Sequence, residues 1–367
     1  MRLTTLLIAS VLAVAVPFLA AEDKPSVIRF GFATVGIDGF SPVAGGSTAG
    51  SAQSKGLIDE EFKADGIRVE WNFFRGAGPA LNEALANGLV DFGWHGDLPS
   101  IIGKSSGLKN KLIIANGTRG GLYIAVPSDS PAKSLEDLKG KRVSIAKGTN
   151  AQLAFAKVLK EHNLTEKDFK LINMDGATSR GALATKDLDG AVGGSELFTL
   201  RDRGVARIVY SVKGRAAYLT RQTAVWVTED FERKYPAIVQ RFVNVLVKEA
   251  VWASDETNRN DVFKTWAKTG QSYSNYKEDY EGTPLRTRQS PLFDEFFVTH
   301  YRDAVASSVE FKLIRNSFDV DAWIEPKYLN HALKEFNLEN HWEEYDAKGL
   351  PKVKPGSDKP ATAAAKP

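Results

Sequence analysis

Short apolar segments alternate with longer amphipathic segments from Val27 to about residue 228. The short segments are rich in Val, Ile, Phe and Ala and are bounded by turn-forming residues, which is typical of buried strands. We predict strands at residues 27–34, 67–74, 90–93, 111–116, 122–126, 142–146, 169–174, 188–193, 206–211 and 223–228.

The segments between these strands carry their apolar residues at helical spacing. NAQLAFAKVLKEHN (150–163) places Leu153, Ala156 and Leu159 on one face, and PALNEALANG (79–88) reaches a stop at Gly88. After residue 228 only helical patterns follow, including PAIVQRFVNVLVKEAVWAS (236–254) and YLNHALKEFN (328–337). A long polar segment, QSYSNYKEDYEGTPLRTRQSP (271–291), separates them. This order predicts the α/β class with mostly parallel sheets.

Two α/β units follow one another before the terminal helices, and 367 residues favour two domains over one. The chain crosses between the units near residues 117–126 and returns near 218–226. We therefore expect two lobes with a ligand cleft between them. Lobe 1 would comprise residues 22–120 and 222–350, and lobe 2 residues 121–221.

Both ends of the chain differ from its body. MRLTTLLIASVLAVAVPFLAA (1–21) has one positive charge, then an apolar run that ends in small residues, which predicts a cleaved secretory signal peptide. A membrane anchor is the alternative, because the run is nearly long enough to span a bilayer. The end, PKVKPGSDKPATAAAKP (351–367), has no apolar period and is expected to be disordered.

The chain contains no cysteine. It therefore has no disulfide, thiolate metal site or cysteine nucleophile, and no cysteine at the cleavage site that could carry a lipid. The five histidines lack metal-ligand spacing, so we expect neither a metal nor a cofactor. An exported protein without a lipid needs an outer barrier to retain it, which favours the periplasm.

The formal charge of +3 comes from the chain ends. The ends together carry +4, from Arg2 and the four lysines of the tail less Asp358. The rest of the chain therefore carries −1. This balance gives no indication of a nucleic-acid-binding surface.

Three turns between a predicted strand and a predicted helix are candidate binding positions. In open α/β sheets, ligands bind beyond the carboxyl ends of the strands, and helix starts offer unpaired N–H groups to anions. The turns are Trp94-His95-Gly96-Asp97, Lys147-Gly148-Thr149-Asn150 and Gly193-Gly194-Ser195-Glu196. We expect Asp97, and Thr149 or Asn150, to be helix caps. The alternative is that all three are ordinary helix starts.

A fourth candidate is the loop GIDGFSPVAGGSTAGSAQSKGL (36–57). Its segment Gly45-Gly46-Ser47-Thr48 could form a backbone concavity for phosphate-like or sulfonate oxygens, or be part of a surface loop. Three arginines near the crossings and the cleft, Arg119, Arg180 and Arg221, are possible partners for an anion, and Trp94 could pack against an apolar ligand tail.

Two stretches resemble a known family. They are IRVEWNFFRGAGPALNEALANGLVDFGWHGDLPSI and SLEDLKGKRVSIAKGTNAQLAFAKVLKEHNLTEKDFKLINM, and the later SFDVDAWIEPKYLNHALKEFNL agrees with them. The chain resembles, over roughly residues 26–340, the periplasmic substrate-binding proteins of ABC transporters for aliphatic sulfonates, taurine and nitrate.

The resemblance implies a two-lobed periplasmic-binding-protein fold of type II, with lobes that close over a small organic anion. It also implies delivery to an ABC transporter permease. The contact positions implied by the matching motifs are His95, Gly96, Asp97, Leu98, Gly148, Thr149 and Asn150, with Ser195, Glu196 and Phe198 on the third turn.

The chain departs from the family at two places. It reads GGSELF where the family commonly has a Trp-x-Pro-Phe-like segment, and its loop after the first strand is longer. A larger or more polar ligand is one hypothesis for that loop.

Other functions remain open from the residues alone. The ligand could be nitrate, an aromatic acid or a vitamin precursor, and the protein could be a sensor subunit. In an enzyme, His95 and Asp97 would be a base and its orienting partner, with Ser195 or Thr149 as nucleophile. The chain has no G-x-S-x-G motif and lacks the cysteine motif of the related thiamine-pyrimidine enzyme. We expect a monomeric binding protein and not an enzyme.

Overall fold

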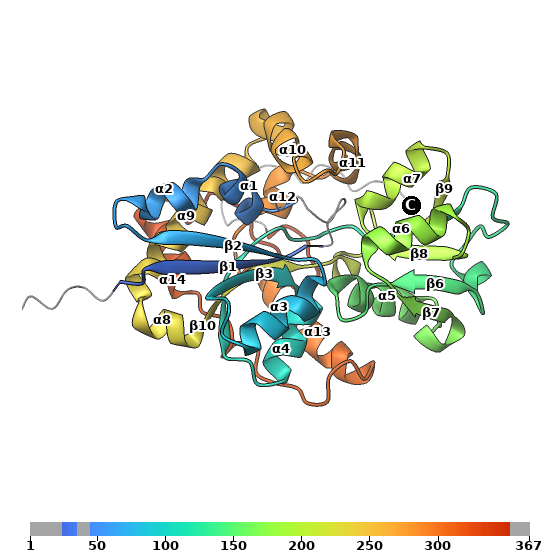
Figure 1. The fold of residues 1–367 in the computed structure, drawn as a ribbon, viewed down its shortest axis with the longest axis horizontal. Helices are drawn as coiled ribbons and strands as arrows, with labels where there is room; N and C mark the ends of the chain where they lie inside the picture. The colour runs from blue at the N-terminus through green and yellow to red at the C-terminus, as the bar shows by residue number, and fades with distance from the viewer. Residues whose placement is uncertain (1–23, 35–44, 353–367) are drawn as a thin grey trace, which may run out of the picture.

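Two five-stranded sheets contain all ten predicted strands (Figure 1). The computed structural model describes residues 24–34 and 45–352. The predicted signal peptide, the loop residues 35–44 and the tail from residue 353 lie outside the described residues.

The first sheet has the strand order β2-β1-β3-β10-β4. β1 pairs in parallel with both β2 and β3, whereas β10 is antiparallel to β3 and β4. The strands are β1 (Val27–Ala33), β2 (Arg68–Phe74), β3 (Phe92–Gly96), β4 (Asn110–Ala115) and β10 (Thr223–Thr228).

The second sheet has the order β7-β6-β8-β5-β9 and a matching pattern of directions. β6 is parallel to β7 and β8, and β5 is antiparallel to β8 and β9. The strands are β5 (Tyr123–Pro127), β6 (Arg142–Ile145), β7 (Lys170–Asn173), β8 (Gly190–Gly193) and β9 (Ala206–Ser211). The expectation of mostly parallel sheets is confirmed, with one antiparallel strand inside each.

The helices of lobe 1, the lobe built on the first sheet, cover both sheet faces. They are α1 (Thr48–Ser54), α2 (Leu57–Lys63), α3 (Ala77–Ala86), α4 (Asp97–Ser105), α8 (Glu229–Lys234), α9 (Pro236–Ser254), η5 (Glu256–Asn258), α10 (Arg259–Ala267), α11 (Tyr273–Asp279), α12 (Leu285–Gln289), α13 (Glu295–Glu310) and α14 (Lys327–Glu335). On one face, Phe92 stacks on Phe242 of α9 with ring centroids 4.3 Å apart. On the other, Trp226 and Trp323 are fully buried with α3, α4 and α13. Each face thus buries a separate apolar core.

Lobe 2, built on the second sheet, has the same three layers. Its helices are η1 (Glu136–Leu138), α5 (Asn150–Glu161), η2 (Glu166–Asp168), α6 (Gly176–Ala184), η3 (Ser195–Leu197), α7 (Phe198–Asp202) and η4 (Ala217–Leu219). α5 buries Phe155 and Leu159 on one face of the sheet, and α6 and α7 bury Leu183 and Phe198 on the other. The two-lobed α/β fold predicted from the sequence is confirmed.

The chain passes between the lobes twice, and the two passages lie side by side. The backbone of Gly120 exchanges hydrogen bonds of 2.8 and 2.9 Å with that of Arg221. Gly120 is the predicted end of the first part of lobe 1, and Arg221 is the predicted end of lobe 2. The exact lobe boundaries stay a prediction. Among the described residues, no helix is both long and apolar enough to cross a membrane.

Candidate functional site

A cavity of about 140 Å³ lies between the two lobes, at the carboxyl ends of β1, β3, β6 and β8. Its apolar wall includes Ala33, Trp94, Pro99, Met174 and Val192. Its polar and charged side chains are those of Thr149, Asn150, Ser179, Glu196, Arg221 and Thr223. This volume is smaller than that of a typical drug-sized ligand pocket, so this arrangement of the lobes suits a small ligand.

Arg221 is the one basic residue among those that line the cavity. Its backbone is fixed to Gly120 at the crossing, and its side chain reaches toward Gly194 at the end of β8. The Nε of Arg221 is buried and has no hydrogen-bond acceptor among the described residues. A guanidinium binds anions through charge-assisted hydrogen bonds, so Arg221 is the expected partner for an anion in the cavity.

Glu196 lies beside Arg221. A Cβ built on Gly194 would be 2.6 Å from Glu196 Oε2 and 2.7 Å from Arg221 Nη2, so both groups border Gly194. The Gly194 N–H donates to Glu196 Oε1 over 2.7 Å, which fixes the carboxylate in the turn. The cavity therefore presents a cation and an anion near one another.

The lobes meet at Gly96. A Cβ on this residue would lie 2.5 Å from the Cβ of Asn150 and 2.7 Å from its Nδ2. Asn150 is the first residue of α5, so the start of this helix can approach β3 only because residue 96 is glycine. Gly148, at φ +74, makes a second close approach, since its Cβ would lie 3.0 Å from Pro79 of lobe 1.

Five of the residues expected at the site line the cavity: Trp94, Gly96, Thr149, Asn150 and Glu196. The others lie outside its lining: His95, Asp97, Leu98, Gly148, Ser195, Phe198, Gly46, Ser47 and Thr48. For most of these residues, the structure shows which other contact the side chain makes.

The prediction of a turn at Trp94-His95-Gly96 is wrong, because these residues continue strand β3 and pair with β10. Successive side chains of a strand point to opposite faces. The Trp94 side chain therefore reaches the cavity, where its Nε1 donates to the carbonyl of Asn116 over 3.0 Å, while His95 faces the core.

His95 belongs to a buried hydrogen-bond chain. His95 Nε2 lies 3.3 Å from Trp226 Nε1 and 3.2 Å from Asn82 Oδ1, and His95 Nδ1 lies 2.6 Å from Ser100 Oγ. The Ser100 hydroxyl is also 2.8 Å from the carbonyl of Gly96. Burial lowers the pKa of His95 to about 3, so the ring is neutral at ordinary pH.

Asp97 is neither the cap of α4 nor the partner of His95. The N-cap is Gly96, and Asp97 is the first helical residue, with its Oδ1 2.7 Å from the N–H of Leu98. Its Oδ2 accepts from His300 Nε2 over 2.9 Å. Both side chains are buried, and burial, reinforced by Lys157, lowers the pKa of His300. The base and orienting partner considered for an enzyme are therefore not assembled.

Thr149 is the N-cap of α5, as predicted, but its hydroxyl donates to the carbonyl of Ala146 over 2.7 Å instead of accepting from the helix. Ser47 caps α1 by accepting from the N–H of Gly50, and Thr48 donates to Gln289 over 3.3 Å. Ser47 and Thr48 are both buried, so the concavity predicted there is filled by protein.

Ser195 and Phe198 lie on the predicted third turn but face other parts of the protein. Ser195 Oγ accepts from Gln271 over 2.7 Å, and Phe198 packs edge-on against Tyr123. Of the other two candidate arginines, Arg119 stacks on Phe296 and Tyr345 near the crossings and is not in the lining. Arg180, on α6, is not in the lining either.

We did not predict one part of the cavity wall from the sequence. Met174, Gly176 and Ser179 come from the turn after β7 and the start of α6, where Asp175 caps the helix. The signal was present, because the MDGATS segment has the same strand, cap and helix order as the three turns that we selected.

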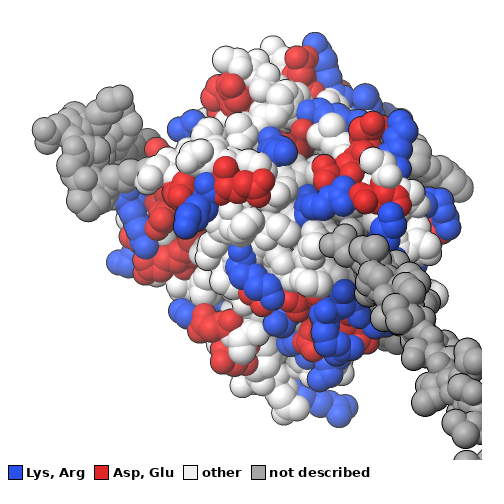
Figure 2. Space-filling view, turned by 90° about the vertical axis from the view of Figure 1, so that its left-hand side faces the viewer, with Lys and Arg blue, Asp and Glu red and all other residues white. Residues whose placement is uncertain are grey.

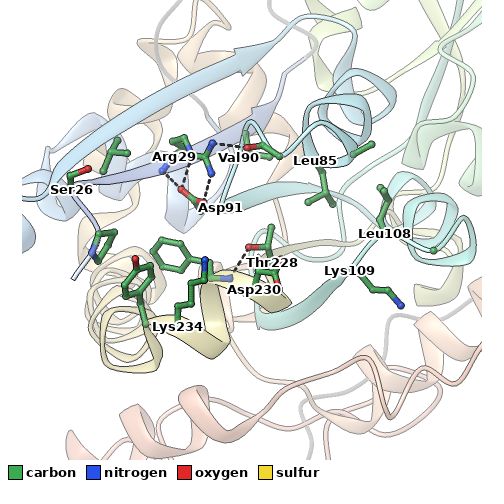
Figure 3. A pocket seen from close by; sticks show the side chains of 17 residues that line it. Ser26, Arg29, Leu85, Val90, Asp91, Leu108, Lys109, Thr228, Asp230 and Lys234 are labelled. Atoms are coloured by element: carbon green, nitrogen blue, oxygen red, sulfur yellow. Dashed lines mark hydrogen bonds and ion pairs between the residues drawn. The ribbon is translucent and has the colours of Figure 1, made fainter. Parts of the chain in front are cut away.

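A larger hollow of about 710 Å³ lies in lobe 1, lined by residues that precede β1 and β3 and follow β10 (Figure 3). Its arginine, Arg29, is already paired, with Nη2 2.6 Å from Asp91 Oδ1 and Nη1 2.6 Å from the carbonyl of Gly88. The hollow is at the amino ends of β1 and β3, away from the other lobe. Lys109 and Lys234 also line this hollow, but ligands of open α/β sheets bind beyond the carboxyl ends of the strands, so we do not select it.

On the face that Figure 2 shows, acidic and basic side chains are interspersed, so no patch of one charge there suggests a second anion-binding site. Among the described residues, no cluster of three or more His, Cys, Asp or Glu side chains is placed to hold a metal ion. The interlobe cavity is therefore the candidate site.

Comparison with known proteins points to one family. A family model described as NMT1/THI5 like matches residues 51–257. A Bacillus subtilis (strain 168) protein named as an aliphatic sulfonates-binding protein is 28% identical over 212 residues. That alignment covers 56% of this chain and 61% of the Bacillus protein, so it spans less than two thirds of that relative's length.

Solved structures with this fold include both a binding protein and an enzyme. The periplasmic sulfonate-binding protein SsuA of Methylobacillus flagellatus KT is 33% identical, with a TM-score of 0.74, over 87% of this chain and 97% of its own. DszB, solved as a mutant with biphenyl-2-sulfinic acid and described as a desulfurization enzyme, is 18% identical, with a TM-score of 0.63, over 84% of this chain and 99% of its own. The second likeness is one of fold alone.

Proposed function

Because the chain belongs to the NMT1/THI5-like family, we propose that it is a solute-binding protein that captures a small organosulfonate between its lobes. The observation that carries this proposal is the interlobe cavity, whose lining includes one basic residue, Arg221, with its guanidinium. A sulfonate is a strong, permanently charged acceptor for such a donor.

The rest of the cavity fits a short organic tail. Ala33, Pro99, Met174 and Val192 supply apolar wall, and the relatives named above are described as binding sulfonates. A cavity of about 140 Å³ supports a small ligand in this arrangement of the lobes. The contact residues that we propose are Trp94, Gly96, Thr149, Asn150, Glu196 and Arg221.

Glu196 favours a ligand that also carries a hydrogen-bond donor. Its carboxylate borders the same residue as Arg221 and would repel a purely anionic headgroup placed against it. An amino-sulfonate such as taurine would place its ammonium at Glu196 and its sulfonate at Arg221. We therefore expect taurine to bind more tightly than ethanesulfonate, which lacks the amine.

The predicted signal peptide and the periplasmic location of the M. flagellatus protein support export of this chain to the periplasm. There it would work as a monomer and deliver its ligand to the permease of an ABC transporter. Catalysis has weaker support, because His95 and Asp97 face the core and the chain contains no cysteine nucleophile.

The proposal is tested by thermal denaturation of the protein with ethanesulfonate, taurine and nitrate. Binding at a hundredfold excess over Kd should stabilise the folded state by about 2.7 kcal/mol. Ligand analysis after incubation should find the sulfonate unchanged. Absence of stabilisation by any sulfonate, or a product released from one, would contradict the proposal.

Arg221→Gln should weaken sulfonate binding by at least about a hundredfold, because a buried charged hydrogen bond is lost. The melting temperature of the empty protein should hardly change. Arg233→Gln, on the exposed part of α8, is the matched control and should bind as wild type does. Titration calorimetry gives both affinities.

A further inference from the structure

Helix α11 of lobe 1 lies between α10 and the lobe 2 helix α7 (Figure 1). It is anchored in lobe 1, where Tyr276 and the adjoining Tyr280 pack against Phe263 and Trp266 of α10. Ser272 caps it by accepting from the N–H of Asn275. The helix comes from the long polar segment at 271–291, whose role the sequence did not explain.

From this anchor, α11 and the residues beside it reach the lobe 2 segment at 195–201. Three side chains of the lobe 1 segment make hydrogen bonds or ion pairs there: Gln271 Nε2 to Ser195 Oγ at 2.7 Å, Asn275 Nδ2 to Thr199 Oγ1 at 2.9 Å, and Glu278 to Arg201 at 2.5 and 2.6 Å. Lys213 of lobe 2 adds a bond of 2.7 Å to the carbonyl of Glu278.

A buried network also joins the lobes beside Gly121, where a Cβ would lie 2.7 Å from Asp279 Oδ1. Tyr123 of β5 donates to Asp279 Oδ1 over 2.6 Å, and Arg288 of α12 donates to Asp279 Oδ2 over 2.7 Å. Burial alone would raise the pKa of Asp279, but the Arg288 charge and the Tyr123 hydroxyl outweigh it and lower that pKa. Asp279 thus remains a carboxylate with a partner from each lobe.

The lobe 2 segment held by α11 is the one that carries Glu196 into the cavity wall. Ser195 and Thr199 lie on either side of Glu196, and both bond to lobe 1. If lobe 2 turned away about the crossings at Gly120 and Arg221, these bonds and the contacts around the cavity would break together.

We propose that Gln271, Asn275 and Glu278 form an interlobe clamp, in which they position the Glu196 turn and favour the closed arrangement before ligand arrives. None of the three lines the cavity, so they are positioning residues. The consequence for ligand affinity rests on the proposed binding function, whereas the consequence for the lobes does not. If the binding-competent closed form is less populated, the apparent Kd rises by the same factor.

The clamp can be tested on the empty protein. Because the chain has no cysteine, a thiol-reactive spin label modifies only the cysteines that are introduced for it. Lys63→Cys on α2 and Lys167→Cys on η2 put one label on each lobe at exposed positions. We expect pulsed electron resonance to give mainly the short interlobe distance. Asn275→Ala with Glu278→Gln should add a population at longer distance.

Asp261→Asn is the matched control, since it removes one carboxylate of an exposed ion pair on α10, within lobe 1. It should leave the distance distribution unchanged. If the double variant does not fold, Thr199→Val removes only the hydroxyl that accepts from Asn275 and gives the same test. Identical distributions in the clamp variant and wild type would overturn the proposal.

Affinity separates the clamp from a merely structural role. The clamp variant should bind ethanesulfonate more weakly by the factor by which its short-distance population falls, while the melting temperature of the empty protein changes little. A lower melting temperature of the empty variant together with unchanged affinity would overturn the clamp. If wild type binds no sulfonate, the proposed ligand is wrong, and the label distances still decide the clamp.

Discussion

At the scale of single residues, Gly96 decides how closely the lobes approach. Its φ of −72° and ψ of 170° are accessible to any residue, so glycine is not needed here for backbone freedom. It is needed because the side chain of Asn150 occupies the place of a Cβ.

Gly96→Ala should therefore weaken sulfonate binding by at least about tenfold, because the added methyl holds lobe 2 away from lobe 1. The empty protein can avoid the clash by opening, so its free energy of unfolding should stay near that of wild type. Titration calorimetry and urea denaturation measure the two quantities.

Gly181→Ala is the matched control, since nothing lies within 4 Å of a Cβ on Gly181. It should bind as wild type does. Unchanged affinity in Gly96→Ala would show that contact between Gly96 and Asn150 is not required for binding.

The residue scale is also where sequence reasoning was weakest. Of the segment around His95, which we predicted to contribute to the site, Trp94 and Gly96 line the cavity. However, β3 ends three residues later than predicted, which reverses the direction of the His95 side chain, and Asp97 has its partner 203 positions away in His300. Side-chain direction depends on pairing with distant strands and helices, which no local pattern encodes.

At the scale of elements, the sequence was a good guide. Ten strands and the four quoted helices appear near their predicted positions, because alternating apolar runs and amphipathic segments reflect how layered sheets and helices bury their faces. Interlobe contacts such as those of α11 could not be predicted. They depend on polar side chains of a segment whose composition, taken alone, resembles a loop.

Helix α6 offers a test at this scale. Asp175 accepts from the N–H groups of Ala177 and Thr178 at 2.9 and 3.0 Å and so satisfies two free donors at the helix start. Asp175→Ala should lower the free energy of unfolding by about 1 kcal/mol.

Asp175→Asn retains a side-chain oxygen and should lose much less. Urea denaturation of both variants makes the comparison. Equal losses in the two would mean that the charge of Asp175, and not its role as a cap, stabilises α6.

At the scale of the whole molecule, stability should depend on pH through two buried histidines. Burial lowers the pKa of His95 to about 3 and also lowers that of His300. Below about pH 6.5 the unfolded chain takes up protons that the folded protein cannot. The unfolded state is thereby favoured, so stability should fall as the pH drops from about 6.5 toward 3.

We expect a loss of up to about 1.4 kcal/mol per pH unit for each histidine, beginning above the range in which carboxylates titrate. Denaturation in urea between pH 7 and pH 5 measures it. His300→Gln should reduce the slope, whereas His331→Gln, at an exposed position of α14, should not. A flat profile over this range would contradict the assignment of buried neutral rings.

The pairing of Gly120 with Arg221 also has a mechanical consequence. A residue on the axis of a rotation is displaced least by it, and Arg221 lies where the two passages between the lobes meet. Its charge would stay near the same place whether the lobes are apart or together, while Asn150 and Glu196 travel with lobe 2. Recognition of the anion and recognition of the rest of the solute are then separable: Arg221 offers its charge in either arrangement, and Asn150 and Glu196 add their contacts only when the lobes are together.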